Sequence, residues 1–151
     1  MKPGADLGAL LIDKHGDGIW LQNRGSIPQG NVCDYAFTIL QAARRRTSKT
    51  EYISCPSCGR TLFDLQQTIK RVKGATSHLK NLKIGIMGCI VNGPGEMADA
   101  DYGYVGSGPH RIALYKGKQC IERNIPEEEA VSRLIALIKA NGDWQDKEIH
   151  A

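Results

Sequence analysis

The apolar residues after position 47 follow two different spacings along the chain. Short apolar runs bounded by Gly, Pro and polar residues are typical of strands, and they occur at 51–54, 82–87, 102–105, 111–115 and 119–123. Helical spacing appears twice, first in Leu62, Leu65, Ile69 and Val72, then in Val131, Leu134, Ile135 and Ile138. The order is therefore one strand, a helix, four strands and a second helix. We predict an α/β fold, arranged as a compact α/β sandwich.

Capping residues set the expected limits of the two helices. Thr61 with Asp64 resembles a capping box, and Gly74 is expected to end the first helix. The second helix is expected to begin at Pro126, followed by glutamates that are favoured in a first turn, and to end at Gly142.

Two further segments are predicted to be turns. Gly, Pro and Gly follow one another within 92–95, so we expect neither a helix nor a regular strand there. Residues 116–118 lie between two apolar runs and are expected to form the turn of a hairpin. The polar tail after Trp144 is expected to fray.

The first 46 residues carry weaker signals. Apolar residues at 7–12 and 18–21 predict two short buried strands, or the end of a helix followed by a strand. Asp34 is the expected N-cap of a helix that runs to about Arg46. We interpret the basic triplet 44–46 as cations that the dipole of this helix favours, with anion binding as the alternative.

A polar linker at 47–50 is the expected domain boundary, so we predict one unit at 1–46 and a second at 47–151. The 151 residues suit one domain, or one domain and a piece of another. With 41% hydrophobic and 24% charged residues, the chain is not expected to be disordered. A net charge of +4 permits an anionic substrate or an acidic partner without indicating nucleic acid. No run approaches the roughly 18 apolar residues of a membrane span, and the first residues do not resemble a secretory signal.

The five cysteines are the strongest candidates for chemistry, because their odd number argues against a fully paired disulfide framework. Cys55 and Cys58 form a Cys-x-x-Cys pair, which in an apparently intracellular protein is more often a metal site or a redox motif. The helix that follows directs its positive end toward this pair and stabilises thiolates. Cys89 lies in a second glycine-rich turn after the next predicted strand.

These residue types leave three interpretations open. An iron–sulfur cluster needs about four ligands aimed at one small volume, and the fourth could be Cys33, Cys120, a histidine or Glu96. Structural zinc could use a histidine, although His78 and His110 are distant from Cys89 in the sequence. A thioredoxin-like dithiol would use Cys55 and Cys58 alone.

The two turns also carry a resemblance. Cys-Pro-Ser-Cys-Gly-Arg-Thr at 55–61 and Met-Gly-Cys-Ile-Val-Asn-Gly-Pro-Gly-Glu at 87–96 resemble the C-terminal domain of the hydroxymethylbutenyl diphosphate synthase family of the non-mevalonate isoprenoid route. The match continues through 97–105 and extends roughly from Leu7 to Trp144, and it is closest to the long, three-domain form.

The resemblance implies a [4Fe-4S] cluster held by Cys55, Cys58, Cys89 and Glu96, with Glu96 as the catalytic ligand that a substrate oxygen replaces. It implies that residues 47–151 resemble the iron–sulfur domains of sulfite and nitrite reductases. Residues 1–46 would be the last strand-and-helix portion of an N-terminal TIM-type barrel.

The implied reaction is the reductive opening and dehydration of methylerythritol cyclodiphosphate to hydroxymethylbutenyl diphosphate, with electrons from ferredoxin or flavodoxin. The implied full-length enzyme is a homodimer in which a barrel of the same or the partner subunit completes the site. It would lie in the bacterial cytoplasm or, in a plant, in the plastid stroma, without nucleic-acid or membrane partners. As a fragment, this chain is expected to turn over no substrate. The alternative is a zinc-stabilised binding module without chemistry.

Overall fold

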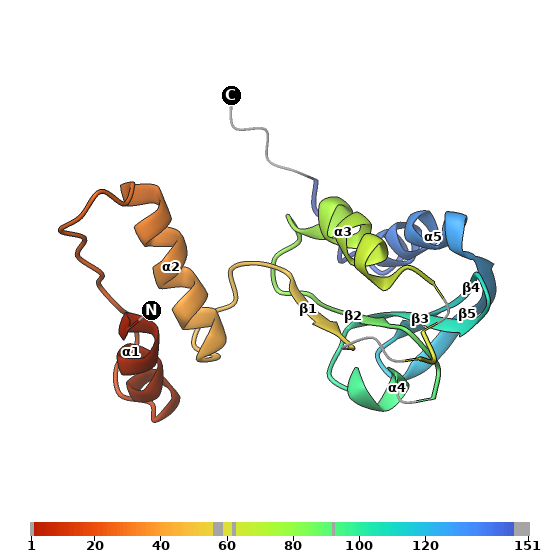
Figure 1. Ribbon diagram of the computed structural model, residues 1–151, viewed down its shortest axis with the longest axis horizontal. Coiled ribbons are helices and arrows are strands. Elements are labelled where there is room, and N and C mark those ends of the chain that lie inside the picture. The colour runs from red at the N-terminus through yellow and green to blue at the C-terminus, as the bar shows by residue number, and fades with distance from the viewer. Residues whose placement is uncertain (1, 56–58, 62, 92, 147–151) are drawn as a thin grey trace. The chain divides into compact units, whose positions relative to one another are not determined.

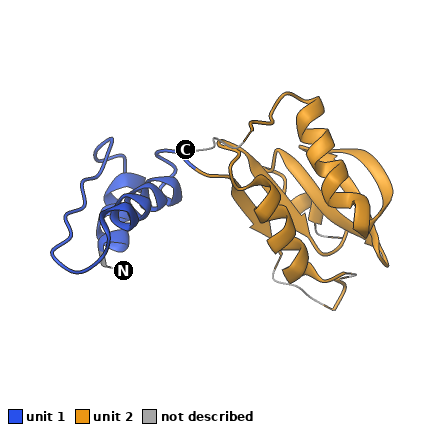
Figure 2. Cartoon of the chain, turned by 90° about the horizontal axis from the view of Figure 1, so that it is seen from above, with its two compact units in different colours: residues 1–48 blue, residues 49–151 orange. Residues whose placement is uncertain are grey.

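The computed structural model describes residues 2–55, 59–61, 63–91 and 93–146 (Figure 1). The chain divides into two compact units, residues 1–48 and 49–151 (Figure 2). Within the described residues, no helix has the length and apolar character needed to cross a membrane.

Unit 1 (residues 1–48) consists of helices α1 (Lys2–Ile12) and α2 (Gln29–Ala42) and the segment between them. Leu11, Leu40 and Ala43 form its small buried core. The predicted strand at 18–21 is wrong, because the described part of unit 1 contains no strand with which it could pair. The stretch 7–12 forms the end of a helix, which was the second of the two interpretations of that pattern.

Helix α2 begins earlier than predicted. Pro28 occupies the N-cap position, and its carbonyl accepts hydrogen bonds from the N–H groups of Asn31 and Val32. The predicted cap at Asp34 is therefore wrong, because the helical ladder already includes this residue. The basic triplet lies beyond the last residue of the helix, where Arg45 forms an ion pair with Asp17 at 3.0 Å.

Unit 2 (residues 49–151) contains a five-stranded mixed sheet in the order β1-β2-β3-β4-β5. The strands are β1 (Glu51–Ser54), β2 (Lys83–Met87), β3 (Tyr102–Gly108), β4 (Arg111–Lys116) and β5 (Gln119–Pro126). The first three strands are parallel, and β4 and β5 continue the sheet in antiparallel pairs. All five predicted strands are thus confirmed. The parallel strands end at one border of the sheet, which we call the carboxyl end.

Helices α3 (Leu65–Thr76) and α5 (Glu127–Ala140) cover one face of this sheet (Figure 1). Alternate strand residues, including Ile84 and Ile86 of β2, contribute to this core. They pack with the apolar stripes of the two helices, represented by Val72 and Leu134. The predicted limits of α5 are confirmed, because it follows Pro126 and ends before Gly142, whose φ is +77°.

The first predicted helix has different ends from those expected. Asp64, rather than Thr61, is the N-cap, and its carboxylate accepts a hydrogen bond from the Gln67 N–H at 2.9 Å. The helix also continues past Gly74 to Thr76. Thr76 is fully buried, and its carbonyl accepts a hydrogen bond from the Thr50 hydroxyl at 2.7 Å, so tertiary contacts hold the last turn.

A short helix, α4 (Gly93–Glu96), lies on the other face of the sheet (Figure 1). The prediction that this segment contains no helix is wrong. Pro94 is tolerated because the first turn of a helix has no acceptor for its backbone N–H groups, so the hydrogen that proline lacks is not missed. The core on this face includes Met87, Met97 and Val105.

The Asp64 cap gives a direct test of how α3 begins. Asp64→Ala is expected to lower the free energy of unfolding by about 1 kcal/mol, because the Gln67 N–H loses its acceptor. Urea denaturation followed by far-UV circular dichroism measures the change. Asp99→Ala, at an exposed position outside the helices, is the matched control and should differ from the parent chain by less than about 0.5 kcal/mol. Equal stability of the two variants would contradict the capping role.

Candidate functional site

The cysteine-containing turns begin at the carboxyl end of the sheet. Cys55 directly follows β1, and Gly88 and Cys89 directly follow β2. These strands are parallel neighbours in which Ser54 pairs with Ile86, so the two turns leave the sheet side by side. The Gly88 N–H donates a hydrogen bond to Cys55 Sγ over an N···S distance of 3.2 Å. The structure therefore joins the thiol of the first motif to the backbone of the second.

Close backbone packing surrounds this hydrogen bond. A Cβ at Gly88 would lie 2.6 Å from Thr61 Oγ1, and a Cβ at Gly106 of β3 would lie 2.4 Å from the Gly88 carbonyl oxygen. Real Cβ atoms essentially never approach other atoms this closely, so a side chain at either position would force a neighbouring group to shift. Gly95 differs, because a Cβ there would have no neighbour within 4 Å. The two cysteine turns therefore pack closely at Gly88, whereas Gly95 has open space beside it.

Glu96 is the last residue of α4 and is exposed, whereas Cys55 and Cys89 are half-buried. Cys58 lies outside the described residues. Within the described ranges, no three His, Cys, Asp or Glu side chains lie close enough to hold a metal ion. Cys55, Cys89 and Glu96 do not by themselves form a closed metal site. The arrangement brings the turns of the two motifs together and leaves the carboxylate accessible from outside.

The two remaining cysteines belong to other elements. Cys33 is exposed on α2 of unit 1. Cys120 lies on β5, the border strand opposite β1, and its Sγ accepts a hydrogen bond from Arg123 Nε at 3.3 Å. This contact raises the pKa of the Arg123 guanidinium. All four described cysteines are free thiols.

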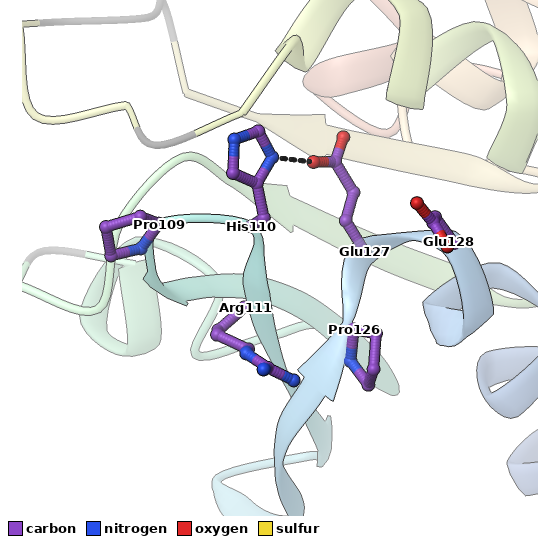
Figure 3. Close-up of a pocket in the computed structure, with 6 residues that line it drawn as sticks. All are labelled: Pro109, His110, Arg111, Pro126, Glu127 and Glu128. Carbon is purple, nitrogen blue, oxygen red and sulfur yellow. Dashed lines mark hydrogen bonds and ion pairs between the residues drawn. The ribbon is translucent and has the colours of Figure 1, made fainter.

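The two histidines weighed as zinc ligands have other neighbours. The His78 ring lies at right angles to Trp144, with 5.0 Å between the ring centroids, and both ring nitrogens are buried without a hydrogen bond among the described residues. His110 Nδ1 lies 3.1 Å from Glu127 Oε2 (Figure 3). This pair lines a cavity of about 290 Å³ at the start of α5. The sequence analysis missed the pairing, since seventeen positions separate the two residues.

Two buried tyrosines on β3 are poor candidates for proton transfer at neutral pH. Burial raises the pKa of Tyr104 to about 12. Burial also raises the pKa of Tyr102, and the hydrogen bond from its hydroxyl to Asp143 Oδ2 adds to the effect. Both phenols therefore stay protonated. The hydrogen bond from Tyr102 to Asp143 also connects the segment after α5 to the sheet.

Comparison with known proteins supports the resemblance seen in the two motifs. Residues 51–140 match the family model described as the GcpE protein C-terminal domain. A Bacteroides fragilis protein named 4-hydroxy-3-methylbut-2-en-1-yl diphosphate synthase (flavodoxin) is 70% identical over 97% of this chain. Proteins of the same name from Phocaeicola vulgatus and Chlorobaculum tepidum are 67% identical over 97% of the chain and 60% identical over 92% of it. The chain covers only 24%, 24% and 18% of these three relatives.

Proposed function

The chain belongs to the family of GcpE protein C-terminal domains, and from this premise we propose that it is the cluster-bearing part of a hydroxymethylbutenyl diphosphate synthase. The observation that carries the proposal is the hydrogen bond from the Gly88 N–H to Cys55 Sγ, which joins the two cysteine motifs. The relatives named as this synthase support the reaction class, an oxidoreductase of isoprenoid biosynthesis.

Cys55, Cys58, Cys89 and Glu96 would hold a [4Fe-4S] cluster. The chemistry of the donor set supports such a group: free thiols are available at Cys55 and Cys89, and an N–H group already donates to one sulfur. Hydrogen bonds to sulfur are among the features that set the reduction potential of these clusters. When bound, the cluster supplies electrons one at a time and a Lewis-acidic iron.

The chain's own residues would present this centre to the substrate. The Gly88 N–H would hold the Cys55 thiol against the turn of Cys89. Gly106 leaves room for the Gly88 carbonyl, so the two cysteine turns can stay close together. Glu96 is exposed, and a substrate can reach its carboxylate without opening the core. The proposed substrate is methylerythritol cyclodiphosphate, which takes up two electrons and two protons, opens its ring and releases one water molecule.

The remaining parts of the proposed enzyme would lie outside this chain. The chain spans about a quarter of the length of the Bacteroides fragilis relative. Unit 1 exposes large apolar side chains, with Ile12 at 66% and Trp20 at 90% of full exposure. We interpret unit 1 as the end of a larger N-terminal domain that would cover these side chains. The relatives' names support a flavodoxin as the electron donor, with ferredoxin as the alternative.

Anaerobic reconstitution with iron and sulfide tests the cluster. The chain is expected to take up about four iron and four sulfide ions per molecule and to absorb broadly in the visible range. Cys120→Ser is the matched control, because Cys120 lies on β5 away from both motifs, and its iron content should equal that of the parent chain. A chain that stays colourless and binds one zinc ion tightly would contradict the proposal and support the zinc-stabilised binding module.

A further inference from the structure

Glu96 belongs to a helix that is too short to hold itself together. Helix α4 spans only Gly93–Glu96. A single helical turn in water loses more conformational entropy than its one or two hydrogen bonds repay. The position of the Glu96 carboxylate must therefore be set by contacts between α4 and the sheet beneath it.

The residue that follows Glu96 makes the closest of these contacts. The Met97 side chain is 1% exposed and occupies a slot formed by two glycines. A Cβ at Gly85 of β2 would lie 2.7 Å from Met97 Cβ, and a Cβ at Gly103 of β3 would lie 2.5 Å from Met97 Cε. Gly85 and Gly103 are paired neighbours in the sheet, so the absence of both side chains creates one continuous depression.

A second contact fixes the other end of α4. Gly93 is buried, and a Cβ there would lie 2.8 Å from Met87 Cβ and 3.2 Å from Val105 Cγ1. The Met97 N–H donates to the Gly93 carbonyl at 3.0 Å and connects the two anchored residues. The helical turn is thus fastened to the sheet at its first residue and immediately after its last. Glu96 lies next to the buried methionine and remains exposed.

We propose that Met97 is a positioning residue for Glu96: by filling the slot between Gly85 and Gly103, it fixes where the carboxylate is offered to the cluster. Met97 acts through Glu96 and does not itself touch the iron. The inference rests on the proposed function, because it assumes that Glu96 holds one iron. Shortening Met97 frees α4, weakens the hold of Glu96 on that iron and leaves the irons held by the cysteines in place.

The test compares Met97→Ala with Leu79→Ala in the anaerobically reconstituted chain. Leu79 is also fully buried but belongs to the core on the opposite face, so its variant controls for a general loss of stability. Met97→Ala is expected to lose one iron to a chelator about tenfold faster than the parent chain. After one-electron oxidation with ferricyanide, the product should also show the electron paramagnetic resonance signal of a three-iron cluster. Leu79→Ala should lose iron at the parent rate although its melting temperature falls.

Two further variants keep the test decisive if Met97→Ala folds poorly. Met97→Leu retains most of the apolar volume and is expected to lose iron at a rate between those of the parent and Met97→Ala. Gly103→Ala should change the rate of iron loss in the same direction as Met97→Ala, because its new Cβ would lie 2.5 Å from both Sδ and Cε of Met97. Adding Gly103→Ala to Met97→Ala should cause less further change than Gly103→Ala causes in the parent, because Sδ and Cε are already absent and only the contact with Tyr115 Cβ at 3.1 Å remains.

The outcomes separate the two proposals. Equal rates of iron loss for Met97→Ala, Leu79→Ala and the parent, with a four-iron cluster in all three, would overturn the positioning role and leave the cluster assignment intact. Equal acceleration in Met97→Ala and Leu79→Ala would also overturn the positioning role, because general destabilisation would then explain the loss. A parent chain that incorporates no iron would overturn the proposed function and the inference together.

Discussion

Replacement of Cys89 by alanine is expected to leave a folded domain that cannot retain the cluster. Cys89 lies in the turn after β2, outside the buried clusters on either face of the sheet, and Ile90 and Val91 beside it are exposed. The loss of folding free energy without iron should therefore be about 1 kcal/mol or less. The loss of cluster should be nearly complete, because one of three thiolates is removed from a centre that needs about four ligands.

Iron and sulfide analysis after anaerobic gel filtration measures the effect of Cys89→Ala. The expected iron content falls from about four ions per chain to fewer than about one. Circular dichroism of the same sample establishes that the fold persists. Cys120→Ala is the matched control, since Cys120 is half-buried like Cys89 but lies on β5. A full iron complement in Cys89→Ala would remove Cys89 from the ligand set and separate the two motifs functionally.

Features set by a local stretch of sequence were predicted correctly, whereas features that depend on contacts with distant segments were not. The strands of unit 2 were predictable because each is a local apolar run, and β1 was placed at its observed residues, Glu51–Ser54. The short strand expected at 18–21 failed because a strand needs a partner, which no local pattern supplies. The predicted N-cap of α3 was wrong because Thr61 and Asp64 are both residue types that suit this position. Only the structure shows which of them accepts the Gln67 N–H.

The candidate site also has one part that was predictable from the sequence and one part that was not. The cysteines were found from their local motifs, and the expected strand before each motif explains why Cys55 and Gly88 meet. The Met97 slot was not predictable, because Gly85 and Gly103 each appear as an ordinary glycine within a strand pattern. Their role in forming the slot depends on the strand register that pairs them and on Met97, which packs against both. A contact between two strands and a residue that follows a helix has no signature in any one of these segments.

The largest effect on the architecture of the site is expected from Gly106→Ala. The new Cβ would lie 2.4 Å from the Gly88 carbonyl oxygen and 3.0 Å from the Phe63 ring. A backbone carbonyl cannot rotate away like the end of a flexible side chain, so either β3 or the Gly88 turn must move. Either movement disturbs the peptide whose N–H donates to Cys55 Sγ. We expect a loss of about 1–3 kcal/mol in the free energy of unfolding, together with loss of the cluster.

Gly108→Ala separates this steric effect from the general effect of adding a methyl group to β3. Gly108 lies on the same strand, and a Cβ there would be 3.7 Å from its nearest neighbour, Arg111 Cβ, which is ordinary van der Waals contact. Urea denaturation and iron analysis of the two variants are then compared directly. Gly108→Ala should retain parent stability within about 0.5 kcal/mol and a full iron content. If Gly106→Ala behaved the same way, the contact between Gly106 and the Gly88 carbonyl would not be what holds the two cysteine turns in register.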